Sequence, residues 1–262
     1  GENFSGTPLD LMPFGGSIVA GQSAQTPYQG GGFRSGLFQD LLDDDRFTTT
    51  MLGSSTALLA NSPTNVNILS IANERNHEGH PGWTTLMMLA NIDADDGNSA
   101  GNGGYWLAPG NGVNPDCIIV NIGGNDAVKY GADSASMSGA AQRLDATVSE
   151  FNQLRPGVKT IVSTIGYRGD GGGSYSKALD AYLNPAIGGI VFNHVLAGQS
   201  VSYLDLRNIM SYPADIGSDK IHPTQAGYDK MANAWYQSLV YGTAYWTGNE
   251  DGNWNTLNGN QS

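Results

Sequence analysis

The stretch LDLMPFGGSIVAG, residues 9 to 21, joins a largely apolar run to a glycine-rich turn and places one hydroxyl, that of Ser17, among glycines and small residues. Unalternating apolar runs of this length are typical of strands buried on both faces, as in parallel sheets. The turn that follows fits a tight passage from a strand into a helix. Ser17 is then either a small turn residue or a nucleophile at the end of the first strand.

Four further apolar runs resemble the first one, and helical periods lie between them. The runs span residues 9 to 14, 47 to 52, 117 to 122, 159 to 165 and 201 to 206. Helical spacing recurs at 33 to 42, at 141 to 154, at 175 to 197 and after Pro223, which is expected at the first position of the last helix. This alternation predicts a flavodoxin-like, three-layer α/β/α sandwich on a five-stranded parallel sheet, with its site at the carboxyl ends of the strands.

The length, net charge and composition of the chain limit the class of protein. At 262 residues the chain is long enough for one main domain, expected over residues 1 to 242, with a tail or the start of a truncated module from 243 to 262. A net charge of −12 disfavours nucleic acid and anionic membranes as partners. No apolar run approaches the ~20 residues that cross a bilayer. A lysine-poor, Asn- and Gly-rich surface suggests a secreted protein without its signal peptide. The oligomeric state is not predicted.

Cysteine and acidic residues bear on metal binding. The only cysteine, Cys117, lies in a predicted strand and has no partner, which excludes a disulfide and a cysteine-type zinc site. Asp93, Asp95 and Asp96 are spaced closely enough to hold a structural calcium ion. The segment lacks the glutamate that ends an EF-hand loop, so a solvated acidic turn is the alternative.

Just before the last predicted helix, the segment SDKIHPTQAGY, residues 218 to 228, carries Asp219 and His222 three positions apart. This spacing lets the carboxylate meet the imidazole Nδ1, fix its tautomer and leave Nε2 free as a base. Such residues also occur in ordinary turns and at helix N-termini, so the pair alone does not decide between the two interpretations.

Two more polar segments are expected at the edge of the sheet where Ser17 lies. NIGGND, residues 121 to 126, follows the strongest strand and presents the amide of Asn125 there, unless it is only a turn. NHEGHPGWTT, residues 76 to 85, places Gly79 and Gly82 in a loop before a helix, where glycines can free backbone N–H groups. Its two histidines have no second ligand cluster to support a metal site.

Taken together, the four segments resemble the GDSL, or SGNH, hydrolase family over residues 9 to about 240. MPFGGSIVAG is similar to the block that carries the nucleophile, EGHPGW to the glycine block, IGGND to the asparagine block and SDKIHPT to the Asp-x-x-His block. HEGHPGWT looks most similar to the acetylxylan esterase-like branch, carbohydrate esterase family three. Gly16 departs from the family's Gly-Asp-Ser, which puts the bracing of neighbouring loops in doubt more than the chemistry.

The resemblance implies a role for each matched residue. Ser17 would be the nucleophile, His222 the general base and Asp219 the residue that orients it. The N–H groups of Ser17 and Gly79 and the side-chain amide of Asn125 would bind the oxyanion. This chemistry requires no cofactor and leaves calcium only a structural role.

These roles predict a serine esterase that removes acetyl or other short acyl groups from plant polysaccharide such as acetylated xylan. The polar loops, with isolated aromatics such as Trp83 as a sugar-stacking surface, contain no apolar stretch for a long acyl chain. One alternative is a lipase or thioesterase for longer chains. The other is a non-catalytic carbohydrate-binding domain on the same fold. Its sugar platforms would be Trp83, Trp106, Trp246 and Trp254.

Overall fold

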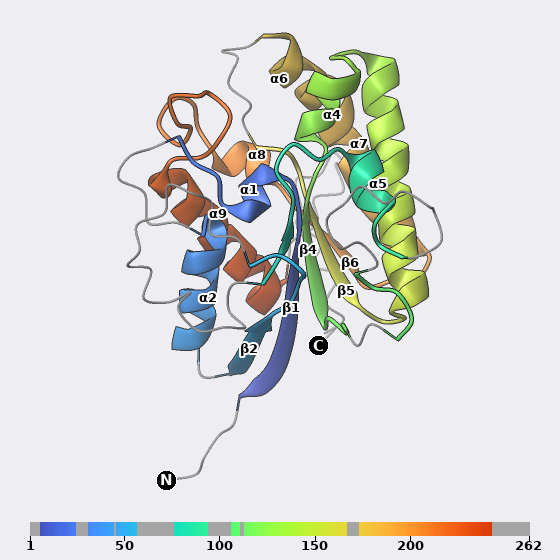
Figure 1. The fold of residues 1–262 in the computed structure, drawn as a ribbon, viewed down its shortest axis with the longest axis vertical. Helices are drawn as coiled ribbons and strands as arrows, with labels where there is room; N and C mark the ends of the chain where they lie inside the picture. The colour runs from blue at the N-terminus through green and yellow to red at the C-terminus, as the bar shows by residue number, and fades with distance from the viewer. Residues whose placement is uncertain are drawn as a thin grey trace, which may run out of the picture.

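A parallel β-sheet forms the centre of the protein, with helices packed against both of its faces (Figure 1). The computed structural model describes residues 6–24, 31–44, 46–56, 76–93, 106–110, 113–166 and 173–242. The strands are β1 (Thr7–Gly15), β2 (Phe47–Met51), β3 (Glu78–Gly79), β4 (Cys117–Asn121), β5 (Lys159–Ser163) and β6 (Val201–Leu204). The helices are α1 (Ser17–Ala20), α2 (Phe33–Asp43), α3 (Thr85–Leu89), α4 (Gly124–Tyr130), α5 (Ser134–Leu154), α6 (Ser174–Ala178), η3 (Leu179–Leu183, a π-helix), α7 (Asn184–Leu196), α8 (Leu206–Ile209) and α9 (Gln225–Tyr241).

The strand order is β2-β1-β4-β5-β6, with every neighbouring pair parallel, and the two-residue β3 pairs with the end of β1. This confirms the predicted three-layer fold, because each of the predicted strand ranges overlaps one strand of this order. Strand β3 was not predicted, since two residues carry no periodic pattern. Gly15 of β1 is in register with Asn121 of β4, so the two segments that follow these strands leave the sheet side by side.

Two apolar cores lie on opposite faces of the sheet. Side chains alternate along β1, so Phe14 packs beneath α5 and α7 whereas Leu11 packs beneath α2 and α9. The Phe14 ring meets that of Phe151 edge to face at 5.0 Å, and Trp235 of α9 is fully buried in the other core. Full burial of such a side chain is worth about 1.5–3 kcal/mol, so the two cores fix the sheet between its helices.

The helix predictions were correct in position and wrong in several boundaries. Helix α9 begins at Gln225 and not at Pro223, because the side chain of Thr224 accepts the Gly227 N–H and caps the helix. Pro223 instead forms an isolated bridge with Ile216. Helix α5 begins seven residues before the predicted start, since the Asp133 side chain caps it. The helix expected at 175 to 197 is divided into α6, η3 and α7.

Cys117 lies in the core as expected, where burial raises the pKa of its thiol to about 12 and makes it unreactive. Within the described segments, no helix is both long and apolar enough to cross a membrane. The predicted tail from 243 to 262, with Trp246 and Trp254, lies outside the described residues.

Candidate active site

Ser17 stands at the sharp turn from β1 into α1. A Cβ at Gly15 would lie only 2.1 Å from the carbonyl oxygen of Asn121, so only glycine lets the two strand ends approach this closely. Gly16 then caps α1 in an extended conformation, and Ser17 is the first helical residue, 9% exposed. The turn thus places the predicted nucleophile at the carboxyl edge of the sheet.

The predicted histidine and aspartate are hydrogen-bonded in series with Ser17. The His222 Nε2 lies 2.8 Å from the Ser17 Oγ, and the His222 Nδ1 lies 2.6 Å from the Asp219 Oδ2. Burial alone would raise the pKa of Asp219, but hydrogen bonds from the His222 side chain and from the backbone of His222 and Ile221 outweigh it and hold that pKa below its ordinary value. An ionised Asp219 keeps the proton on Nδ1, which leaves the Nε2 lone pair facing the serine hydroxyl.

The loop that carries His222 is tied to the segment that carries Ser17. The Asp219 Oδ1 accepts the N–H groups of Ile221 and His222 at 2.9 and 3.0 Å. The Ser23 hydroxyl, just beyond α1, donates to the Pro223 carbonyl at 2.8 Å. Contacts separated by about two hundred residues in sequence therefore fix the serine and the histidine relative to one another.

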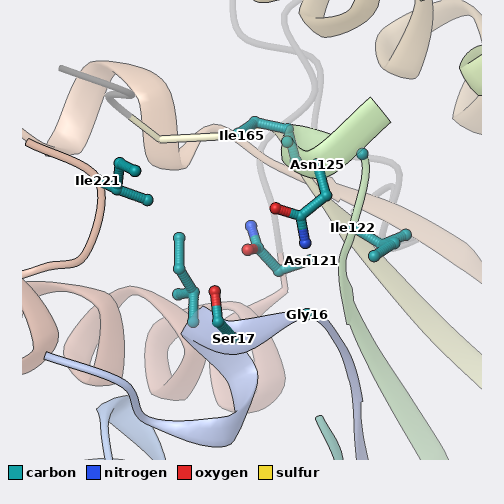
Figure 2. Close-up of a pocket in the computed structure, with 10 residues that line it drawn as sticks. Gly16, Ser17, Asn121, Ile122, Asn125, Ile165 and Ile221 are labelled. Carbon is teal, nitrogen blue, oxygen red and sulfur yellow. The ribbon is translucent and has the colours of Figure 1, made fainter. Parts of the chain in front are cut away.

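Asn125 lies beside the nucleophile turn at the start of α4 (Figure 2). A Cβ at Gly16 would be 3.3 Å from its Nδ2, and that nitrogen donates to the Trp83 carbonyl at 2.9 Å. The neighbouring Asp126 is fully buried. Its carboxylate accepts the N–H and hydroxyl of Thr85 and a guanidinium N–H of Arg143.

Gly79 was expected in a loop with its N–H facing the oxyanion, and in the structure it lies in β3. Its N–H donates to the His77 Nδ1 at 2.9 Å, so the group already has an acceptor within its own loop. A Cβ at Gly79 would lie 2.4 Å from the Ala20 nitrogen, and the glycine is therefore required by the packing of α1 against β3. Gly82, in the next turn, has φ +80, and among the described residues its N–H has no hydrogen-bond acceptor.

A buried aromatic stack supports this loop, and the sequence did not reveal it. The His80 imidazole stacks between Trp83 at 4.3 Å and Trp106 at 4.9 Å, and its Nε2 lies 2.9 Å from the Glu78 Oε2. Burial raises the pKa of Glu78, against hydrogen bonds from His80 and Ser54 that lower it. Trp83 is only 6% exposed, so its predicted role as a sugar-stacking surface is not supported by the structure.

The metal predictions fall largely outside the described residues. Asp93 is described, whereas Asp95 and Asp96 are not, so the calcium hypothesis stays a prediction. In the part of the chain that the structure describes, no group of three His, Cys, Asp or Glu side chains could hold a metal ion.

A small cavity opens beside the Ser17 hydroxyl (Figure 2). Its volume of about 30 Å³ gives room for roughly two water molecules. Its walls combine isoleucines and glycines with three polar side chains. They are Gly16, Ser17, Ile18, Asn121, Ile122, Gly123, Gly124, Asn125, Ile165 and Ile221.

A serine, a histidine and an ionised aspartate in series at the carboxyl edge of a parallel sheet define a site of the serine-hydrolase class. Residues 14–230 match the model of the GDSL-like Lipase/Acylhydrolase family, and the chain belongs to that family. The family is one of ester hydrolases.

Individual proteins similar to this chain include two curated sequences and one solved structure that bears on the family. A multidomain esterase of Ruminococcus flavefaciens is 24% identical over 88% of this chain and 28% of its own length. A putative endoglucanase X of Acetivibrio thermocellus is 30% identical over 59% of this chain and 62% of its own. The chain thus spans less than two thirds of either curated relative. The structure of a family 3 carbohydrate esterase of Clostridium thermocellum, 26% identical, superposes with a TM-score of 0.64 over 89% of this chain and 96% of that one.

Proposed function

We propose that this chain is a secreted serine esterase that removes acetyl and other short acyl groups from plant polysaccharide such as acetylated xylan. The observation that carries the proposal is the hydrogen-bonded series of Ser17, His222 and Asp219 beside a cavity of about 30 Å³. Family membership supports the reaction class, a carboxylic ester hydrolase. The likeness to a family 3 carbohydrate esterase supports a sugar ester as the substrate.

In the proposed reaction, the Ser17 Oγ attacks the ester carbonyl while the His222 Nε2 takes its proton. The tetrahedral intermediate then expels the sugar alkoxide, which receives that proton from His222, and leaves an acyl-serine. Water attacks this ester with His222 again as the base, and acetate leaves as Ser17 regains its proton. Asp219 stays ionised throughout, because its hydrogen bonds hold its pKa below the ordinary value.

Three donors are proposed for the oxyanion. Two are those expected from the sequence, the Ser17 N–H and the Asn125 Nδ2, which both border the cavity. In place of Gly79, whose N–H is bonded to His77, we propose the N–H of Gly82. Gly82 precedes Trp83, whose carbonyl accepts the Asn125 amide. A donor of this kind typically lowers the activation barrier by about 3–4 kcal/mol, so the role of each one can be tested by kinetics.

The size of the cavity favours a short acyl group. An acyl chain gains about 0.8 kcal/mol for each methylene that it buries, so a lipase needs an apolar groove along which a chain can lie. A volume of about 30 Å³ holds roughly two water molecules, which suits an acetyl group or an acyl group of similar size. The alternative of a lipase or thioesterase for long chains is therefore disfavoured.

The test measures kcat and KM on acetyl and octanoyl p-nitrophenyl esters, and acetate release from acetylated xylan. We expect kcat/KM to fall steeply from acetyl to octanoyl, and Ser17→Ala and His222→Ala to lose nearly all activity while they stay folded. A folded variant with more than about a tenth of the wild-type kcat would contradict the assigned roles, because the loss of any one member of a catalytic triad lowers kcat by orders of magnitude. Equal rates on octanoyl esters without acetate from xylan would favour the lipase alternative. A wild-type chain that binds xylan but hydrolyses no ester would favour the carbohydrate-binding alternative.

A further inference from the structure

One polar side chain in the cavity has no part in the proposed reaction. Asn121 is the last residue of β4, only 5% exposed, and lies among the residues that line the cavity. In Figure 2 its side chain extends into the space beside Ser17 and Asn125. A buried amide in a wall that is otherwise mostly isoleucine and glycine costs free energy unless its polar atoms are paired.

The hydrogen bonds of this amide determine which way it faces. The Asn121 Nδ2 donates to the Ser163 Oγ at 2.8 Å and to the Thr164 carbonyl at 3.3 Å. The Ser163 hydroxyl donates its one proton to the Val120 carbonyl at 3.0 Å, so it can only accept a hydrogen bond from Asn121. A carbonyl likewise only accepts. Both partners therefore require the nitrogen of the amide, and its oxygen must take the other position.

The Asn121 Oδ1 consequently presents an acceptor to the cavity. Within the described residues this oxygen has no hydrogen-bond partner. The groups proposed to act on the ester, by contrast, donate to its oxygen or take a proton from Ser17. The cavity thus combines donors for the ester oxygen with a separate, fixed acceptor.

We infer that Asn121 is a specificity-determining residue of the acyl pocket, an inference that rests on the proposed esterase function. Its Oδ1 accepts a hydrogen bond from a donor carried on the acyl group, so the pocket takes the 2-hydroxyacyl class, of which glycolyl is the smallest member, as well as acetyl. A propionyl group has nearly the shape of glycolyl but places a methyl group where glycolyl has its hydroxyl. That methyl would cover the acceptor without pairing it, which is the costly arrangement for a buried polar atom.

The first arm of the test uses the wild-type chain and needs no variant. The kcat/KM values on p-nitrophenyl acetate, glycolate and propionate are each divided by the rate of hydroxide-catalysed hydrolysis of the same ester, which removes intrinsic reactivity. We expect the corrected glycolate value to exceed the propionate value by about tenfold or more.

The second arm compares Asn121→Leu with Ile165→Leu. Leucine has nearly the shape of asparagine but no acceptor, so in Asn121→Leu the corrected ratio of glycolate to propionate should fall to roughly one. Ile165→Leu changes the shape of the same cavity without changing its polarity, and should leave that ratio within about twofold of the wild-type value even if both rates change. A loss of folded enzyme would lower all the rates together and would not move the ratio.

The outcomes separate the inference from the proposed function. If the wild-type chain hydrolyses none of the three esters, the proposed function fails. If it hydrolyses the acetate with a corrected ratio near one, or if Ile165→Leu moves the ratio as much as Asn121→Leu does, only the inference about Asn121 fails. If Asn121→Leu does not fold, the wild-type ratio alone decides.

Discussion

Replacing Asp219 with asparagine isolates what its carboxylate does for His222. The Asp219 Oδ1 accepts two backbone N–H groups, from Ile221 and His222, so an asparagine keeps its oxygen there and places its NH2 where Oδ2 was. In the wild-type chain, Oδ2 lies 2.6 Å from the His222 Nδ1. The new NH2 is a donor at this position, so Nδ1 must become an acceptor and the ring proton must move to Nε2.

That shift removes the base. With a proton on Nε2, which lies 2.8 Å from the Ser17 Oγ, the imidazole can no longer accept the serine proton. The wrong tautomer in a serine triad typically lowers kcat by about 10⁴, which corresponds to about 5.5 kcal/mol on the barrier. The two backbone hydrogen bonds to Oδ1 remain in Asp219→Asn, and the Asp219 side chain is 31% exposed, so the variant should lose only about 1 kcal/mol of stability.

The assay is kcat on p-nitrophenyl acetate near neutral pH, with the melting temperature of each variant measured beside it. Asp219→Ala is the matched control, since it removes the contacts of both carboxylate oxygens: it should be as inactive as Asp219→Asn and melt at a lower temperature. A folded Asp219→Asn that retained more than about a tenth of the wild-type kcat would refute the tautomer argument.

Three further changes test the loops around the site. Gly16→Asp should keep activity within about tenfold, because the backbone of Gly16 is extended and accepts a side chain. Its Cβ would lie 3.3 Å from the Asn125 Nδ2, a tight contact that this amide must relieve by a small shift, so no gain in stability is expected. A folded but inactive variant would show that the site needs glycine there. Lys220→Gly should raise the melting temperature relative to Lys220→Ala, since Lys220 has φ +62 and only glycine relieves about 1 kcal/mol of strain; equal melting temperatures would disprove stored strain. Burial alone would raise the pKa of Asp215, yet hydrogen bonds from Lys230 and Ser211 hold that pKa below its ordinary value. The ionised carboxylate therefore stabilises the fold above about pH 4, and this contribution is lost as the pH falls through the lowered pKa. Asp215→Asn should lose less stability than the wild type between pH 5 and pH 2, and parallel losses in the two proteins would contradict this.

The fold was predictable because its central strands are largely buried. The apolar residues of β1, β4 and β5 gather in short runs, such as Cys117 to Val120 in β4, that need no tertiary information to recognise. The boundaries of the helices were less predictable, because they depend on single caps. The Asp133 side chain lengthens α5 and Thr224 displaces the start of α9 from Pro223, and neither effect alters the apolar period on which the predictions rested.

The proposed catalytic side chains were predictable for a different reason. Ser17, Asp219 and His222 occupy short segments whose order fixes their place at one edge of a parallel sheet. The proposed glycine donor was not predictable, since sequence shows where a glycine lies and not where its N–H points. Gly79 and Gly82 lie in one short segment of the sequence. The structure distinguishes them, because the N–H of Gly79 donates to the His77 Nδ1 and Gly82 has φ +80.

The absence of an aspartate at Gly16 leaves the question of what braces the loops beside the nucleophile. The His80 N–H donates to the Gly15 carbonyl at 2.9 Å, which ties the loop after β3 directly to the nucleophile turn. The carbonyl of Trp83 in the same loop holds the Asn125 amide, and the stack of Trp83 on His80 makes the two contacts one rigid unit. Gly16 has no side chain to offer, but the residues on either side of it are fixed by this loop. Since the loops are held without an aspartate, Gly16→Asp should add little bracing, and its effect on the rate should for that reason stay within about tenfold.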